Sequence, residues 1–329
     1  YDAVISNYFN KISNINFPKK KVLYGNLIEN LRYGENPHQK SAIYSSDPNN
    51  KLDKLHGKQL SYNNYNDIFS ALKISRSFPK NRGTVIVKHA NPCGVSLLQN
   101  NLDSYKSALA CDPISAFGGI VSCNFKINKS IAYEINKTFF EVILAKSFDT
   151  NALRILKRKK NLRIIDISNF KERENSAIKL FNNSFLLQDK DNIIFNKKDL
   201  RFVTKNKPSK KEIKEMEFAF NVCKFVKSNA IVIAKDLSTI GIGAGQQNRL
   251  DSCKIAVSKA KKFQPKKLSN SVAASDAFFP FPDGVQNLIN AGIKIIVQPG
   301  GSIRDKEIIK LANKSKIKMI FTGLRHFNH

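Results

Sequence analysis

Two short apolar runs, each preceded by a stretch with helical spacing and followed by a turn, constrain the fold of this chain most. Residues 84–88 read Thr-Val-Ile-Val-Lys, and residues 231–235 read Ile-Val-Ile-Ala-Lys. β-Branched residues are enriched in strands, and strands buried on both faces read as continuous apolar runs. Segments 66–78 and 210–227 predict a helix before each strand, the first starting at Asn66 or Asp67. The pattern is typical of an α/β sheet whose second half partly repeats the first.

The rest of the chain suggests two domains. At 329 residues it exceeds the size at which one core usually stops growing. Residues 1–20 are expected to form a connecting helix or linker, and the polar, lysine-rich segment 171–210 places a domain boundary near 198. Further predicted elements are a helix within 128–146 leading into a strand at 142–144, strands at 164–165 and 293–297, a tight turn at 299–302 and a helix at 305–313.

The composition agrees with a cytoplasmic enzyme. No apolar run approaches the roughly 20 residues that span a bilayer, and the N-terminus lacks a signal-peptide pattern. The five cysteines are odd in number and form no CxxC pair, which favours reduced thiols over a disulfide framework or a structural zinc site. Because the chain begins at Tyr1 without methionine, we expect it to be part of a longer protein.

The formal net charge is +29, and a pI near 9.9 ordinarily suggests nucleic-acid binding. Of the 55 basic residues, however, only 11 are arginines, and the lysines are scattered among asparagine and isoleucine. Nucleic-acid surfaces favour arginine forks, with aromatic residues interleaved for stacking on single strands. We therefore expect no nucleic-acid partner, although the excess charge would attract anionic substrates.

Two adjacent ionisable side chains, Lys88 and His89, follow the first strand, and Asn91-Pro92 with Gly94 predicts the turn that ends it. Polar side chains at the end of a buried strand point into the crevice where α/β proteins bind ligands. A histidine there can take a proton near neutral pH, and a neighbouring lysine can stabilise negative charge. A surface pair that merely caps a turn is the alternative.

Three competing motifs are incomplete. GIGAGQQ at 241–247 places its third glycine one residue early for GxGxxG, and no acidic residue follows at the ribose position. A zinc deaminase needs HxE and PCxxC, whereas Asn91 stands two residues after His89 and Ser96 three after Cys93. A GxxxxGK[ST] loop for ATP phosphates is also missing from the sequence.

Seven segments, in this order, resemble the transformylase portion of the bifunctional purine biosynthesis enzymes, which formylates aminoimidazole carboxamide ribotide (AICAR). They cover the chain from about residue 20 to its C-terminus. The segments are RYGENPHQ at 32–39, KHANPCG at 88–94, SAFGGIV at 115–121, SNAIVIAKD at 228–236, GIGAGQQNR at 241–249, SDAFFPFPDGV at 275–285 and LRHFNH at 324–329.

The resemblance implies a three-layer α/β/α fold of two tandem cytidine-deaminase-like subdomains, which we expect at residues 21–197 and 198–329. It also implies formyl transfer from 10-formyltetrahydrofolate to the 5-amino group of AICAR. In the family the lysine-histidine pair, here Lys88 and His89, performs the chemistry. Asn229 matches the asparagine that keeps the amine and the formyl group in register.

Other positions match the family's ligand-binding residues. Those expected to bind the nucleotide are Arg32, Tyr33, Gly118, Glu141, Arg249 and Phe327, with Glu141 standing where some members have aspartate. Those expected to bind the folate are Leu250, Phe278, Phe281, Asp283, Ser302, Ile303 and Arg325. A flat apolar pterin with polar edges suits the two phenylalanines for packing and Asp283 for hydrogen bonds.

Family members form homodimers whose active sites include residues of both subunits, and they carry an upstream IMP cyclohydrolase domain. The resemblance therefore predicts a homodimer, and formyl transfer without ring closure for these 329 residues. Some members bind a monovalent cation such as potassium through backbone carbonyls. No zinc, nucleotide cofactor or membrane is implied. The alternative from another class is a basic RNA-binding or scaffold protein built on an inactivated enzyme fold.

Overall fold

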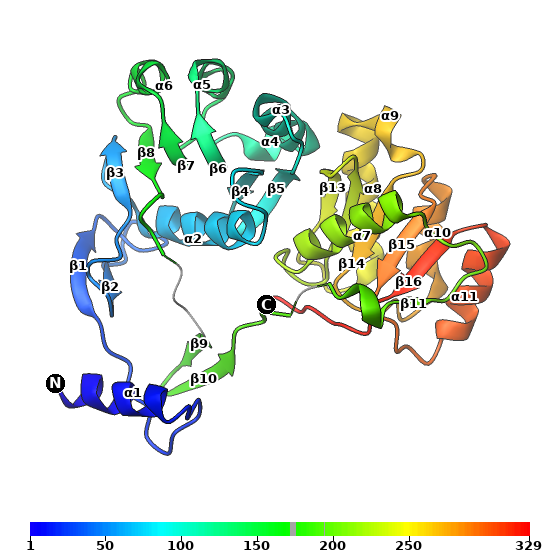
Figure 1. The fold of residues 1–329 in the computed structure, drawn as a ribbon, viewed down its shortest axis with the longest axis horizontal. Coiled ribbons are helices and arrows are strands. Elements are labelled where there is room, and N and C mark those ends of the chain that lie inside the picture. Colours follow the sequence, from blue (N-terminus) through cyan, green and yellow to red (C-terminus); the bar gives the residue numbers. More distant parts are fainter. Residues whose placement is uncertain (172–175, 194) are drawn as a thin grey trace.

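The computed structural model of the protein describes residues 1–171, 176–193 and 195–329. A mixed sheet of 12 strands forms the middle layer, and helices cover both of its faces (Figure 1). This arrangement confirms the predicted three-layer α/β/α fold.

The first half of the sheet is built from residues 53 to 166. Its elements follow one another as β3 (Asp53–His56), α2 (Tyr62–Arg76), β4 (Thr84–Lys88), β5 (Asn91–Ser96), α3 (Asn101–Cys111), α4 (Pro113–Ala116), β6 (Ile120–Ile127), α5 (Lys129–Asn136), β7 (Val142–Phe148), α6 (Thr150–Leu156) and β8 (Arg163–Asp166).

The second half repeats this order element by element. It consists of β11 (Arg201–Phe202), α7 (Lys210–Cys223), β12 (Ile231–Lys235), β13 (Ser238–Gly243), α8 (Arg249–Phe263), α9 (Pro265–Leu268), β14 (Val272–Ser275), α10 (Pro282–Asn290), β15 (Ile295–Gln298), α11 (Asp305–Lys314) and β16 (Lys318–Phe321). The relation to cytidine deaminase and the boundary near 198 stay predictions.

The sheet is symmetric in its strand order, β11-β16-β15-β14-β12-β13-β5-β4-β6-β7-β8-β3. The halves meet where β5 pairs antiparallel with β13, at Ser96 and Ser238, whose hydroxyl groups lie 2.8 Å apart. Corresponding strands of the two halves therefore run in opposite directions.

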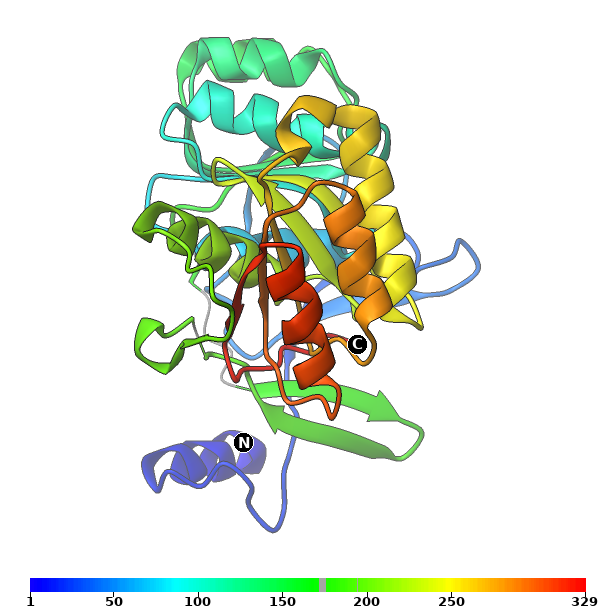
Figure 2. The ribbon, with the colours of Figure 1, turned by 90° about the vertical axis from the view of Figure 1, so that its right-hand side faces the viewer.

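The apolar core follows the alternation of side chains along each strand. Val85 and Val87 of β4 face one side and join a cluster that also contains residues of α2 and α7, whereas Ile86 faces the other side. The cluster under α2 and α7 is continuous across both halves. On the opposite face, α3, α5 and α6 cover a first-half cluster, and α8, α10 and α11 cover a separate second-half cluster. Figure 2 shows α7 and α8 on opposite sides of the second half.

The helix predicted from Asn66 or Asp67 begins earlier, at Tyr62. Ser61 forms a capping box with Asn64: its hydroxyl accepts from the Asn64 backbone at 3.2 Å, and the Asn64 side chain accepts from the Ser61 backbone at 3.1 Å. Ser209 and Glu212 form the same device at the start of α7. The capping box of α2 is hard to recognise in the sequence, because its third helical residue is Asn64, where glutamate or glutamine is usual.

The turn predicted at Asn91 to Gly94 is wrong, because these residues belong to β5. The chain reverses earlier, at His89 and Ala90, whose φ angles are 53° and 57°. Pro92 is accommodated because the pairing shifts register between Ile86 and Val87. The helix expected within 128–146 is the short α5, and β7 follows after a loop.

Several elements lie outside the large sheet. Residues 1–20 contain a helix, α1 (Asp2–Ile12), as expected for a connecting segment. Two antiparallel hairpins were not predicted: β1 (Asn26–Leu31) with β2 (Ser41–Ser45), and β9 (Ser176–Phe181) with β10 (Ser184–Asp189). A short 3₁₀ helix, η1 (Lys197–Asp199), precedes β11.

Candidate active site at one edge of the sheet

Strand directions bring most of the predicted site residues to one edge of the sheet. In the first half, β4 ends at this edge with Lys88, followed by His89. Because β6 runs antiparallel to β4 and β7 runs parallel to β6, both strands begin at the same edge. Gly118 stands just before β6 and Glu141 just before β7.

The second half contributes to the same edge because of the antiparallel junction. β4, β5, β13 and β12 alternate in direction, so β12 begins where β4 ends, just after Asn229. β14 runs antiparallel to β12, and β15 and β16 run parallel to β14, so all three end at this edge. Phe278, Ser302 and Arg325 follow these three strand ends. Sequence alone could not show this convergence, because it depends on the β5–β13 pairing.

Lys88 and His89 differ in exposure. The His89 side chain is exposed, whereas Lys88 is half-buried and its Nζ donates a hydrogen bond to the Phe117 carbonyl at 2.7 Å. A Cβ atom at Gly118 would lie 3.8 Å from Lys88 Nζ, and Gly118 has a φ of +76° that favours glycine. The ammonium group of Lys88 therefore lies beside the backbone of Gly118, which has no side chain.

Asp67 of α2 holds the turn that carries His89, a role the sequence analysis did not assign. Its carboxylate accepts hydrogen bonds from the backbone N–H groups of His89, at 3.1 Å, and Ala90, at 2.7 Å. Burial raises the pKa of Asp67, and the two backbone bonds and the charge of His89 only partly oppose that rise. The corresponding residue of α7, Glu215, is also acidic. This match between the two halves is the feature of the sequence that could have indicated a role for Asp67.

Asn229 is held by several bonds at once. Its side-chain NH₂ donates to the carbonyls of Gln246, at 2.8 Å, and Gln247, at 3.1 Å. Its Oδ1 accepts a hydrogen bond from Arg249 Nη2 at 2.7 Å. The orientation of the Asn229 amide is therefore fixed by its surroundings.

Arg249 lies beneath Asn229 and is almost completely buried. Its Nη1 donates to the hydroxyl of Ser275 at 2.8 Å and to a carboxylate oxygen of Asp276. The other Asp276 oxygen accepts from the Ser228 hydroxyl at 2.6 Å. Ser228, Ser275 and Asp276 were not among the predicted site residues, although they lie in the motif segments 228–236 and 275–285.

The two halves are also bridged near this edge. Asn91, which pairs with Lys88, accepts a hydrogen bond from the Lys227 backbone N–H at 2.9 Å, two residues before Asn229. The C-terminal segment returns to the same place, because the Ser228 N–H donates to the Asn328 carbonyl at 3.0 Å. Arg325 and Phe327 therefore lie near Ser228, with the guanidinium carbon 4.6 Å from the centre of the Phe327 ring.

The residues predicted to bind the nucleotide in the first half surround the start of α2. Arg32 is exposed and stacks on Tyr33, with its guanidinium carbon 4.6 Å from the ring centre. The loop after it is tied to α2, because the Asn63 side chain donates to the Glu35 carbonyl at 3.1 Å. Glu141 accepts a hydrogen bond from the neighbouring Asn64 side chain at 2.8 Å.

The residues predicted to bind the folate are mostly exposed. Phe278 and Phe281 are 37% and 50% exposed, and Ile303 is fully exposed. The Arg304 guanidinium carbon lies 4.8 Å from the Phe281 ring centre. The remaining members of the set are Leu250 in the first turn of α8, Asp283 in the first turn of α10, Ser302 in the loop before α11, and Arg325 after β16.

Strand spacing sets how far apart these groups lie in one chain. Neighbouring strands are about 4.8 Å apart, so the end of β4 lies roughly 14 Å from the start of β12 and roughly 24 Å from the end of β15. The structure brings Lys88, His89 and Gly118 together, and it brings Asn229, Arg249 and Arg325 together. Ser302, which follows β15, is separated from His89 by the width of five strand spacings in the same chain.

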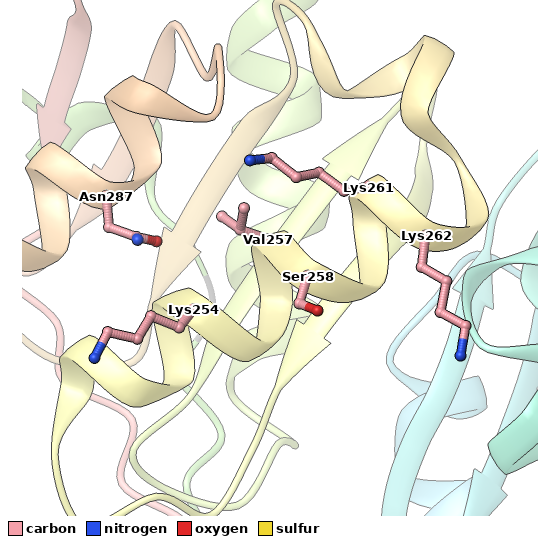
Figure 3. A pocket seen from close by; sticks show the side chains of 6 residues that line it. All are labelled: Lys254, Val257, Ser258, Lys261, Lys262 and Asn287. Atoms are coloured by element: carbon pink, nitrogen blue, oxygen red, sulfur yellow. The ribbon is translucent and has the colours of Figure 1, made fainter.

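A separate groove of about 500 Å³ lies on the outer surface of α8 and α10. Figure 3 shows its lining side chains, Lys254, Val257, Ser258, Lys261, Lys262 and Asn287. None of them is a predicted site residue. The candidate site is therefore defined by the strand ends and not by this surface groove.

The family model for the AICARFT/IMPCHase bienzyme matches residues 1–259. The abbreviation joins AICAR formyltransferase and IMP cyclohydrolase. This chain belongs to the AICARFT/IMPCHase bienzyme family.

Individual relatives cover the whole chain. It is 44% identical to the bifunctional purine biosynthesis protein PurH of Thermoanaerobacter sp. (strain X514) and 44% identical to that of Aquifex aeolicus (strain VF5). It is 43% identical to the PurH protein of Bacillus cereus (strain B4264). In each case all of this chain is matched, but only 64% or 65% of the relative's length.

Membership in this family bears on the alternatives. A basic RNA-binding or scaffold protein is not supported, because the relatives that match the whole chain are purine biosynthesis proteins.

Within the part of the chain that the structure describes, no group of three or more His, Cys, Asp or Glu side chains could hold a metal ion. None of the described helices has the length and apolar character needed to cross a membrane.

Proposed function

We propose that this chain transfers the formyl group of 10-formyltetrahydrofolate to the 5-amino group of AICAR, giving formyl-AICAR and tetrahydrofolate. The observation that carries this proposal is the position of Lys88, His89 and Asn229 at one edge of the sheet, in a member of the AICARFT/IMPCHase family. A cytoplasmic location fits the reaction.

His89 is the base in this proposal. The lone pair of the AICAR amine is delocalised into the ring and carboxamide, so the amine is a weak nucleophile until it loses a proton. The exposed imidazole of His89 takes that proton as the nitrogen attacks the formyl carbon. The tetrahedral intermediate then expels N10 of the folate, which gains a proton.

Lys88 stabilises the charge that develops during this step. The formyl oxygen becomes an oxyanion in the tetrahedral intermediate, and a preorganised cationic donor lowers the energy of that state. Lys88 is held in place by its bond to the Phe117 carbonyl and lies beside Gly118. Its ammonium group can also donate the proton that N10 requires.

Asn229 aligns the amine and the formyl group, and Arg249 acts indirectly. Since Arg249 is buried and bonded to Asp276, Ser275 and Asn229, we assign it the role of orienting Asn229 and not that of binding phosphate. Arg32, an exposed guanidinium, is the better phosphate ligand because it can form two parallel hydrogen bonds. Tyr33, Gly118, Glu141 and Phe327 complete the nucleotide site.

The folate site consists of Leu250, Phe278, Phe281, Asp283, Ser302, Ile303 and Arg325. We propose that a second copy of the chain brings such a set next to His89 in a homodimer. The separation of roughly 24 Å between the ends of β4 and β15 supports this, since reacting atoms must approach to about 3–3.5 Å. A potassium ion bound by backbone carbonyls is a further expectation from the family.

The test is a formyl-transfer assay with AICAR and 10-formyltetrahydrofolate, followed by the absorbance of the tetrahydrofolate that is formed. We expect turnover by the 329-residue chain and its loss when either substrate is omitted. Folded protein that binds neither ligand would disprove the proposal.

A further inference from the structure

The turn that presents His89 has an unfavourable backbone conformation. His89 and Ala90 both have left-handed φ angles, 53° and 57°, although neither is glycine. A left-handed conformation is unfavourable for a residue with a side chain, so surrounding contacts must hold the turn. The two hydrogen bonds from the turn to Asp67, at 3.1 and 2.7 Å, supply such contacts.

We propose that Asp67 is a positioning residue for the reaction, because its carboxylate fixes the backbone from which the His89 side chain projects. The inference rests on the proposed formyl transfer. Each carboxylate oxygen accepts from one of the two N–H groups, so the carboxylate fixes both the position and the orientation of the turn relative to α2. A displacement of about 1 Å in a catalytic group can lower the rate roughly 100-fold.

The second half of the molecule contains a corresponding acidic residue and turn, without a histidine. Glu215, the sixth residue of α7 as Asp67 is of α2, is buried and lies against the backbone of Asp236. Asp236 and Leu237 have φ angles of 51° and 53°, like His89 and Ala90. Because the β12–β13 turn lies at the opposite edge of the sheet, Glu215 serves as a matched structural control.

The experiment compares Asp67→Asn, Asp67→Glu and Glu215→Gln with the wild-type chain. The amide of Asp67→Asn can accept from only one of the two N–H groups, so we expect kcat to fall roughly 10- to 100-fold. AICAR affinity, measured by calorimetry, should change less than about 2-fold, because no substrate contact is removed. Asp67→Glu should regain most of the lost turnover, because it restores the carboxylate.

Glu215→Gln separates positioning from stability. It should lower the melting temperature as Asp67→Asn does, but leave kcat unchanged. Equal kcat for Asp67→Asn and wild type, or an equal loss in Glu215→Gln, would overturn the inference. If Asp67→Asn fails to fold, the comparison is repeated in a chain that carries Ala90→Gly, because glycine adopts the left-handed conformation without strain. The variant with both changes is then compared with Ala90→Gly alone. An inactive wild-type chain would instead refute the proposed function.

Discussion

Asp276 and Arg249 form an ion pair that is closed to solvent, with side chains 0% and 6% exposed, directly beneath Asn229. Asp276 also accepts a hydrogen bond from Ser228, so a single carboxylate organises the segment that precedes β12. A buried charge without its partner is costly, which makes this pair a sensitive point for both stability and activity.

Asp276→Asn is expected to lower the free energy of unfolding by about 3–5 kcal/mol, because it leaves the Arg249 guanidinium buried without a counter-charge. Turnover should fall as well, since Arg249 orients Asn229. Urea unfolding and the formyl-transfer assay measure the two effects. Glu134→Gln, which disrupts the exposed pair with Lys137 at the end of α5, is the control and should change neither. Unaltered stability of Asp276→Asn would contradict the expectation.

His89→Ala is expected to reduce turnover by roughly 10² to 10⁴, the usual effect of losing a positioned acid–base group. AICAR binding should change much less, because the imidazole acts mainly in the transition state. Asp236→Ala alters the corresponding turn at the opposite edge and should retain full turnover. Near-normal kcat for His89→Ala would exclude this residue as the base.

The local elements were predictable wherever apolar runs and caps mark them. The strand at 84–88, the strand at 231–235 and the helix from Asp305 agree with the structure because each depends on local pattern alone. The β4–β5 turn was misplaced because proline and glycine usually mark turns. Here the turn is formed by His89 and Ala90, whose left-handed backbone conformation is stabilised by hydrogen bonds to Asp67, a residue distant in sequence.

Motif matching proposed candidate site residues, but the sequence could not predict how they are arranged. Motif matching named Asn229 and Arg249, but only the structure shows that Arg249 is buried beneath Asn229. The partners Asp67 and Asp276 act through backbone and buried contacts, which leave little signal in a single sequence. The meeting of the two halves at one edge depends on the pairing of β5 with β13, a contact between residues more than 100 positions apart.

Arg32→Ala is expected to weaken AICAR binding by about 1.5–3 kcal/mol, the range for a lost charge-assisted hydrogen bond. Affinity for a folate analogue should stay nearly constant, as calorimetry with each ligand can show. Arg154→Ala removes another exposed arginine, on α6, which carries no predicted site residue. It should affect neither ligand. Equal loss of both ligands in Arg32→Ala would point to misfolding.

Stability should fall in acid partly through Asp112, which pairs with Lys259 across the two halves at 2.9 Å. Burial raises the pKa of Asp112, but hydrogen bonds from Lys259 and Ser115 outweigh it and bring the pKa below its ordinary 3.8. A lowered folded-state pKa means that the carboxylate stabilises the fold above this ordinary value. That contribution is lost as the pH falls through the lowered value.

The measurement is urea unfolding of wild type and Asp112→Asn from about pH 7 down to about pH 2. The variant should be less stable by a constant amount at the upper end, and the difference should shrink toward the lower end. A difference that persists undiminished in acid would show that the ionised carboxylate is not its source.

The proposed homodimer, in which each site takes residues from both subunits, predicts complementation between two inactive variants, His89→Ala and Arg325→Ala. His89 follows the end of β4, whereas Arg325 lies near Ser228, just before the start of β12. These two strand ends are roughly 14 Å apart. If one site takes His89 from one subunit and Arg325 from its partner, a mixed dimer contains one site with both residues intact and one with neither. At full exchange half of the dimers are mixed, so about a quarter of the sites should regain activity. Continued inactivity, with exchange confirmed by mass spectrometry, would show that both residues serve one site from the same chain.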